Sequence, residues 1–303
     1  MNFVKDGKMD RHQEIINLKP QNEFFIGIDS DGSVFDTMEI KHKECFCPTL
    51  IKHFELQDIS EYVREVWDFV ALYSQTRGLN RFRGLVKTFD YLSERPEVTS
   101  RKQSFINIDP IREWVQQETK LSNETLKAYA DKTGHEVLYR ALRWSEDAYE
   151  EIKKKVHDLP PFRFAYESLE KLSERADAVV VSHSNVEALQ REWKDGSVDR
   201  FVDFIAGQEY GIKEELLRYS AVGKYKEDKM MMIGDAPDDL KAAKHNGMLF
   251  FPIIPGEEEA SWERFYKEAV DKFFLGTYAG LYEEELIEEF DKRLPEKPKW
   301  KNN

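Results

Sequence analysis

Five short apolar runs limit most strongly what this chain can fold into. Each has the length and composition of a buried strand, and the first ends abruptly in the turn sequence Asp-Ser-Asp-Gly. The runs lie at residues 24–28, 178–181, 201–205, 230–233 and 249–253. Helical patterns separate the later runs, at about residues 185–195, 213–222 and 237–246. Strands that alternate with helices in this way predict a parallel sheet with crossover helices, which is an α/β fold.

The long stretch between the first and second runs has a different pattern. Apolar residues recur there at helical spacing, for example across residues 56–72 and 138–156, and no segment has a convincing strand pattern. The pair Pro160-Pro161 marks the end of the stretch, because proline ends helices and stiffens the chain. We therefore predict a discontinuous core with a helical domain inserted after its first strand. The predicted domains are a core of residues 1–37 and 160–303 and a helical insertion of residues 38–159.

The C-terminal part of the chain shows two more amphipathic helical patterns, within residues 257–292. Trp262, Phe265 and Phe273 share the apolar face of the first pattern, and this face predicts packing against the core. The remaining tail, residues 295–303, is rich in lysine and proline and is predicted to fray.

Composition narrows the class of protein. Among the 303 residues, Lys and Arg number 45 and Asp and Glu number 58, which gives a net charge of −13 and argues against a general nucleic-acid binder. No apolar run approaches the ~20 residues that a membrane span needs, and residues 1–21 lack the apolar segment of a secretory signal. Two cysteines are too few for a disulfide scaffold. We predict a cytoplasmic globular enzyme or binding protein with no nucleic-acid or membrane partner; the sequence does not indicate its oligomeric state.

Acidic and hydroxyl side chains follow three of the predicted strands. Asp29 and Asp31 follow the first run, Ser182 ends the second, and Asp235 and Asp239 follow the fourth. Ligands of α/β sheets bind beyond the carboxyl ends of the strands, so we expect these side chains around one rim. Two carboxylates ~4 Å apart repel by roughly 4 kcal/mol at an effective dielectric of ~20, unless a cation lies between them. Oxygen ligands favour a hard cation, and Mg²⁺ fits a partly hydrated octahedral site.

The motifs at these strand ends resemble those of the haloacid dehalogenase (HAD) superfamily. Its first motif, Asp-x-Asp-Gly-Thr/Ser followed by a hydrophobic residue, matches residues 29–34. Its second motif, a Ser or Thr that ends an apolar strand, matches Ser182, and its fourth, Gly-Asp-x-x-x-Asp, matches residues 234–239. The helical insertion is similar to the superfamily's C1 cap. The resemblance implies a Rossmann-like parallel sheet core with an inserted all-helical cap.

The resemblance also implies a role for each polar residue. Asp29 would be the nucleophile that attacks phosphorus and forms an aspartyl-phosphate, and Asp31 would protonate the leaving alkoxide and then activate water. Ser182 and nearby backbone N–H groups would bind phosphate oxygens. The Asp29 carboxylate, the Asp31 carbonyl and the Asp235 carboxylate would hold Mg²⁺, and Asp239 is a further candidate metal ligand.

The superfamily's third motif is a lysine, and two lysines are candidates for it. Lys213 lies near the start of the helix that follows the third predicted strand, which is the end at the carboxyl rim. Lys224 lies past the other end of that helix. The geometry favours Lys213 without excluding Lys224.

The loop after the second predicted strand holds two further features. His183 is a candidate for substrate binding. Ser184-x-x-Glu187 has the pattern of a capping box, which predicts a helix N-terminus beside the phosphate position.

A short basic segment lies within the predicted cap. Residues 77–87 contain four basic residues and no acid, and glycines flank the first part of the segment. We predict a loop between helices in which Arg77 and Arg81 bind a second anionic group of the substrate. The alternative is a solvated loop with surface arginines.

Together these patterns predict a Mg²⁺-dependent phosphatase of the HAD type that hydrolyses a small phosphorylated metabolite through an aspartyl-phosphate. Asp31 argues against dehalogenases, which lack the second carboxylate, and against phosphonatases, which replace it. A phosphomutase of the same superfamily and a non-catalytic HAD-fold binding protein remain alternatives. Sugar phosphates, nucleotides and phospho-acids all remain open as substrates.

Overall fold

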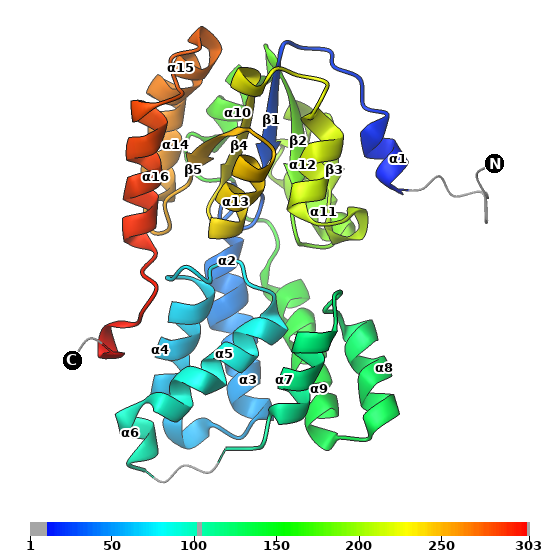
Figure 1. Ribbon diagram of the computed structural model, residues 1–303, viewed down its shortest axis with the longest axis vertical. Coiled ribbons are helices and arrows are strands. Elements are labelled where there is room, and N and C mark those ends of the chain that lie inside the picture. The colour runs from blue at the N-terminus through cyan, green and yellow to red at the C-terminus, as the bar shows by residue number, and fades with distance from the viewer. Residues whose placement is uncertain (1–10, 102–104, 302–303) are drawn as a thin grey trace, which may run out of the picture. The chain divides into compact units, whose positions relative to one another are not determined.

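The chain forms two compact units. The computed structural model describes residues 11–101 and 105–301 (Figure 1). One unit, which we call the core, contains residues 1–37 and 158–293, and the other, which we call the cap, contains residues 38–157 and 294–303. No helix of the described ranges is long and apolar enough to cross a membrane.

The core is built on a five-stranded parallel sheet with the order β3-β2-β1-β4-β5. The strands are β1 (Phe24–Ile28), β2 (Ala176–Val181), β3 (Phe204–Ala206), β4 (Met230–Gly234) and β5 (Leu249–Pro252). The first strand is central and fully buried, as its unbroken apolar sequence predicts. Its last residue, Ile28, pairs with Val180 on one side and Ile233 on the other, so three strands end at the same edge of the sheet. The predicted Rossmann-like α/β core is confirmed.

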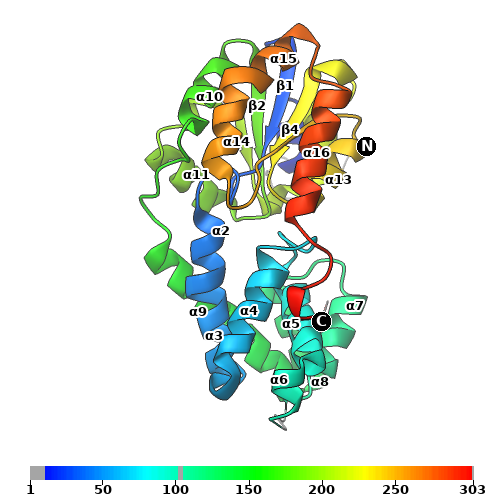
Figure 2. The ribbon, with the colours of Figure 1, turned by 90° about the vertical axis from the view of Figure 1, so that its left-hand side faces the viewer.

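Helices cover both faces of this sheet. They are α1 (Arg11–Ile16), α10 (Ala165–Ser173), α11 (Val186–Asp195), α12 (Lys213–Ala221), α13 (Pro237–His245), α14 (Glu258–Arg264), α15 (Val270–Leu275) and α16 (Leu281–Arg293). On one face lie α12 and α13, and on the other lie α10 and α14, which Figure 2 shows in front of the strands. Helix α12 packs so closely that a Cβ on Gly27 would lie 2.4 Å from the Leu217 side chain. A glycine in the middle of β1 therefore has a packing reason.

The third strand differs from its predicted bounds of 201–205. Asp199–Phe201 forms a 3-10 turn instead, and β3 begins at Phe204. Asp203 explains the shift: its N–H donates to the Ala178 carbonyl at 2.8 Å, and its carboxylate accepts the Ala178 N–H at 2.8 Å. Because the Asp203 carboxylate takes the place of a backbone carbonyl, the regular pairing of β3 with β2 begins only after Asp203.

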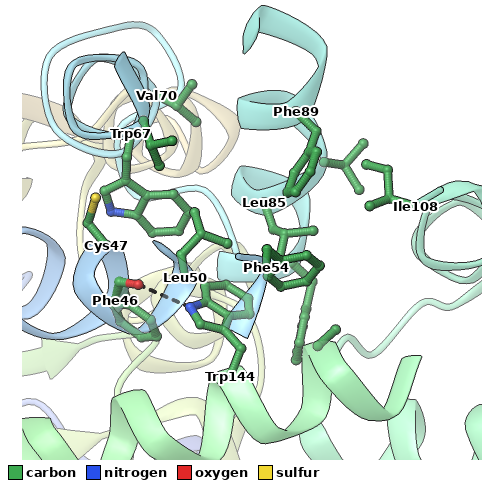
Figure 3. Close-up of a cluster of buried hydrophobic side chains, with 14 of the residues drawn as sticks. Phe46, Cys47, Leu50, Phe54, Trp67, Val70, Leu85, Phe89, Ile108 and Trp144 are labelled. Carbon is green, nitrogen blue, oxygen red and sulfur yellow. Dashed lines mark hydrogen bonds between the residues drawn. The ribbon is translucent and has the colours of Figure 1, made fainter. Parts of the chain in front are cut away.

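Helices, and no strands, make up the regular secondary structure in the described residues of the cap. Its helices are α2 (Thr37–Glu39), which begins at the last core residue, α3 (Cys47–His53), α4 (Ser60–Ala71), α5 (Arg81–Glu94), α6 (Pro96–Thr99), α7 (Asp109–Gln117), α8 (Asn123–Thr133) and α9 (Glu136–Lys155), with a π-helical stretch at Ile40–Phe46. Aromatic side chains fill its centre (Figure 3). The Trp67 and Trp144 rings meet edge to face, and the Trp144 indole donates to the Phe46 carbonyl at 3.0 Å.

The C-terminal tail from Leu294 belongs to the cap, although the sequence predicted that residues 160–303 are part of the core and that residues 295–303 fray. Leu294 is buried, and its carbonyl accepts a hydrogen bond of 2.9 Å from the Gln75 side chain. The Trp300 ring meets Phe69 edge to face, and the Arg95 guanidinium lies 4.6 Å from the Trp300 ring centroid. Aromatic contacts of Trp300 and the buried Leu294 thus hold a tail whose lysines and prolines had suggested that it is unstructured.

We expect the substitution Trp300→Ala to lower the free energy of unfolding by about 2 kcal/mol, because it removes a half-buried indole from an aromatic cluster. Urea denaturation of the purified protein measures this loss. Lys297→Ala is the matched control, since Lys297 lies in the same tail and is exposed. A loss no larger than that of the control would contradict the proposed docking of the tail.

Candidate active site

Three carboxylates meet at the carboxyl edge of the sheet. Asp29 directly follows β1, Asp235 directly follows β4, and Asp239 lies in the first turn of α13. One carboxylate oxygen from each lies within 4.8 Å of the others, and all three residues are buried. The strands β1 and β4 are parallel and end at the same edge of the sheet. The carboxylates that follow them therefore lie on one rim.

Lys213 neutralises part of this charge. Its ammonium lies 3.0 Å from Asp29 Oδ2 and 2.6 Å from Asp239 Oδ1, and the side chain is only 6% exposed. Lys224 lies elsewhere: its ammonium donates to the carbonyls of Ile15 at 3.2 Å and Leu18 at 3.0 Å, beside α1. Of the two candidate lysines, the structure brings Lys213 to the carboxylates.

The pKa values follow from burial and from these neighbours. Burial raises the pKa of Asp29 well above its ordinary value; the Lys213 ammonium opposes this, and the Asp239 and Asp235 carboxylates add to it. Burial also raises the pKa of Asp239. Burial alone would lower the pKa of Lys213, but the Asp239 and Asp29 carboxylates hold it above its ordinary value. Three buried carboxylates facing one ammonium form an oxygen-rich donor set that fits a hard divalent cation.

Asp239 holds other groups in place. Its Oδ1 contacts Lys213, while its Oδ2 accepts the backbone N–H groups of Asp235 at 3.2 Å and Ala236 at 3.0 Å. A Cβ on Gly234 would lie 2.4 Å from the Asp239 side chain, so the glycine makes room for this carboxylate. Since both of its oxygens have partners, Asp239 is better suited to position Lys213 and the loop than to bind a metal directly.

Two hydroxyl groups that the sequence analysis did not select hold Asp31. The Thr37 hydroxyl donates to its Oδ1 and the Ser184 hydroxyl donates to its Oδ2. Ser184 was expected to cap a helix, and that prediction is wrong: Asn185 caps α11 by accepting the N–H groups of Glu187 at 3.0 Å and Ala188 at 3.3 Å. Helix α11 starts one residue later than a Ser184 cap requires, which leaves Ser184 for Asp31. The sequence signal that could have identified Ser184 as a site residue is its position, two residues after Ser182 in the loop that follows β2.

Ser182 and His183 lie in different environments. The Ser182 side chain is buried at the end of β2, and its Oγ accepts the Ser184 N–H at 3.2 Å. The His183 side chain is 45% exposed, with Nε2 3.9 Å from Asp238 Oδ2. Ser182 is therefore part of the buried rim, and His183 lies at its surface.

A third hydroxyl connects the first and fourth motifs. The Ser33 Oγ donates to Asp235 Oδ1 at 2.7 Å, and both residues are buried. The turn between Asp29 and Ser33 requires Gly32, whose φ of 78° lies in the left-handed region. The small residues of the first motif thus allow a tight turn and a direct link to the carboxylate after β4.

The basic segment of the cap is not the loop that the sequence predicted. A turn that contains Arg77 leads into α5, which begins at Arg81. Asn80 starts this helix by accepting the Phe82 N–H at 3.0 Å. Gly84 lies inside α5, where a Cβ would come within 3.9 Å of the neighbouring helix. The glycine that suggested a loop therefore lies in a helix that faces α4, at a position where a Cβ would make only an ordinary contact.

Both candidate arginines of this segment contact groups of the cap itself. Arg77 is buried, and its guanidinium donates to the Leu72 carbonyl at the end of α4 at 2.9 Å. Arg81 donates to the Ser145 hydroxyl at 2.7 Å and to the Asn123 side chain at 2.8 Å. These contacts stabilise helix ends and helix pairs, so neither arginine is the solvated surface residue of the alternative interpretation.

The fold and this rim define a Rossmann-like hydrolase core with an inserted helical domain. The family model of haloacid dehalogenase-like hydrolases matches residues 79–253, and the chain belongs to this family. The match spans Ser182, Lys213, Asp235 and Asp239, and it begins after the first motif.

Several solved structures are similar to this chain. A haloacid dehalogenase-like family hydrolase from Streptococcus pneumoniae is 14% identical, with a TM-score of 0.44 over 81% of this chain and 91% of that one. A proposed phosphoglycolate phosphatase from Lactobacillus delbrueckii is 15% identical, with a TM-score of 0.44 over 76% and 85%. A proposed HAD hydrolase from Bacillus subtilis, solved bound to magnesium, is 15% identical, with a TM-score of 0.40 over 76% and 86%. A search of curated proteins gave no match.

Proposed function

We propose that this hydrolase is a Mg²⁺-dependent phosphatase that cleaves a small phosphomonoester through an aspartyl-phosphate. The observation that carries the proposal is the contact of Lys213 with Asp29 and Asp239 beside Asp235, in a family member whose first motif also supplies Asp31. This arrangement combines a nucleophile, a cation site and a second carboxylate for proton transfer.

The carboxylates of Asp29 and Asp235, with the carbonyl of Asp31, are the groups that would hold Mg²⁺. The bound ion would neutralise charge on the phosphoryl group. Asp239 would act by positioning Lys213, because its own oxygens are already paired. This assignment revises the prediction that Asp239 is itself a ligand.

The proposed reaction gives each of these side chains one role. Asp29, whose ionised form is disfavoured by burial and favoured by the Lys213 ammonium, attacks phosphorus and forms the acyl phosphate. Asp31 gives its proton to the oxygen of the leaving alkoxide, then takes a proton from the water that attacks the aspartyl-phosphate. The hydroxyls of Thr37 and Ser184 hold the Asp31 carboxyl for both transfers. Ser182 and nearby backbone N–H groups of the loop after β2 would bind phosphate oxygens.

Three further residues are proposed to act on the part of the substrate beyond the phosphate. His183 is the proposed contact at the rim, since it is partly exposed and follows the phosphate-binding serine. Arg77 and Arg81 donate hydrogen bonds to groups of the cap and would act on the substrate, under this proposal, by shaping the cap.

Release of phosphate from a generic aryl phosphate tests the proposal. We expect release in the presence of Mg²⁺, its loss on addition of EDTA, and its return when Mg²⁺ is added in excess. A panel of sugar phosphates, nucleotides and phospho-acids then ranks substrates by kcat/KM. Phosphate moved within a substrate without release would indicate the phosphomutase, and Mg²⁺ binding without turnover of any ester would indicate a non-catalytic binding protein.

A further inference from the structure

Two buried tryptophans donate hydrogen bonds into the loop that carries Asp29 and Asp31. The indole N–H of Trp193, on α11, donates to the Ser30 hydroxyl at 2.9 Å. The indole N–H of Trp262, on α14, donates to the Ser33 carbonyl at 2.7 Å. Both indoles are fully buried, so water cannot replace either hydrogen bond. The loop is therefore held from two separate helices of the core.

Ser30 lies between the two acids of the first motif. Its side chain is fully buried, and its carbonyl accepts the Val34 N–H at 2.9 Å, which closes the turn. The Trp193 ring also packs edge to face on Phe35, the residue that ends the turn, at 6.0 Å between centroids. Trp193 thus contacts the turn at both of its ends, and Ser30 is the residue that joins Asp29 to Asp31 in the chain.

Trp262 acts at the other side of the turn. The Ser33 carbonyl accepts its N–H, while the Ser33 hydroxyl donates to Asp235 Oδ1 at 2.7 Å. A displacement of Ser33 would therefore be transmitted to a carboxylate of the candidate metal site.

Burial of tryptophan does not by itself require such hydrogen bonds in this protein. The indole N–H groups of Trp67 and Trp114 in the cap are buried and have no partner in the described residues. Both tryptophans of the core, in contrast, donate to the same short turn. Trp144 of the cap also donates, to the Phe46 carbonyl, so the distinguishing feature of Trp193 and Trp262 is that both donate to one turn of the site.

We propose that Trp193 and Trp262 are positioning residues that hold the turn of residues 29–35 in the geometry for nucleophilic attack and cation binding. The proposal deepens the phosphatase proposal and rests on it where turnover is the measurement. Its physical basis is that reacting groups must be held within a fraction of an ångström, because a displacement of about 1 Å can cost a hundredfold in rate.

The test is a double-mutant cycle of Ser30→Ala and Trp193→Phe, with Trp262→Phe as a separate variant. Phenylalanine keeps most of the ring and removes the N–H. We expect each single substitution to lower kcat about tenfold with KM changed less than twofold, and the double variant of the cycle to be no worse than the poorer single variant. If the losses in kcat from Ser30→Ala and Trp193→Phe add up in the double variant, the hydrogen bond between the two residues is not the cause of the lower kcat.

The control is Trp144→Phe, which removes an indole hydrogen bond of 3.0 Å within the cap. It should lower the urea midpoint like the core variants and leave kcat unchanged. Calorimetric titration with Mg²⁺ gives a measurement that needs no turnover: Trp262→Phe should weaken Mg²⁺ binding several-fold and Trp144→Phe should not.

If the core variants lose stability like Trp144→Phe but keep both kcat and Mg²⁺ affinity, the tryptophans only pack and the inference is wrong. If the wild type releases no phosphate, the phosphatase proposal fails, while Mg²⁺ affinity still tests the positioning role of Trp262.

Discussion

Replacing Asp29 by asparagine is expected to lower kcat for phosphate release at least about a thousandfold while the protein stays folded. The amide has the size of the carboxylate but is not a nucleophile toward phosphorus, and loss of a nucleophile commonly removes most of the catalysis. Stability should change by less than about 1 kcal/mol, because burial already disfavours the ionised form of Asp29 and Lys213 keeps its contact with Asp239.

The measurement is kcat with a generic aryl phosphate at saturating Mg²⁺, together with urea denaturation. Asp238→Asn is the matched control, since Asp238 lies on the same rim with its side chain 47% exposed. It should keep kcat within about twofold, in line with the small effects of exposed substitutions. An Asp29→Asn protein that retains a tenth of the wild-type kcat would rule out the aspartyl-phosphate.

Replacing Lys213 by methionine is expected to abolish activity and to lower the free energy of unfolding by about 3–5 kcal/mol at neutral pH. The substitution removes the ammonium that contacts Asp29 and Asp239 and leaves their carboxylates buried without it. Breaking a buried ion pair by removing one partner has an effect of this size, because the remaining charge is neither paired nor hydrated.

The stability loss of Lys213→Met should depend on pH in a defined direction. Burial raises the folded-state pKa of Asp29 and Asp239 above the unfolded value, and the Lys213 ammonium opposes that rise. Without the ammonium the folded-state pKa values rise further. Stability from such groups is present at low pH and is lost as the pH rises through the folded-state pKa, so the gap to the wild type should widen from pH 5 to pH 8.

Chemical denaturation at both pH values, with and without Mg²⁺, measures this gap. Mg²⁺ should narrow it at pH 8, since a second cation among the carboxylates replaces part of the lost charge. Lys224→Met is the control: it loses two hydrogen bonds to backbone carbonyls near α1 and should keep full activity. If Lys224→Met lost activity and Lys213→Met did not, Lys224 and not Lys213 would be the lysine of the third motif.

The strand ends of the site were predictable because each carries a strong local signal. A buried apolar run that stops at an acid or a serine identifies Asp29, Ser182 and Asp235 without any knowledge of their neighbours. The starts of α12 and α13 were also predicted at the residues where the structure has them. A proline and two acids mark the first turn of α13, and two acids mark the first turn of α12.

The partners of polar side chains were not predictable in the same way. Ser184 fits a capping motif, yet Asn185 caps the helix and Ser184 binds Asp31. Arg77 and Gly84 fit a basic loop, yet one contacts a helix end and the other lies in a helix interface. Local patterns do not record which distant group lies within 3 Å of a hydroxyl or a guanidinium.

The sequence by itself determined the α/β class, the inserted helical segment and the acids at the strand ends, because these depend on periodicity and on residues adjacent in the chain. Only the tertiary structure decided that Lys213 and not Lys224 reaches the carboxylates, that the tail docks on the cap through Trp300, and that two core tryptophans hold the turn between Asp29 and Ser33. Those contacts join residues far apart in the chain, and only the tertiary packing of each unit brings them within contact distance.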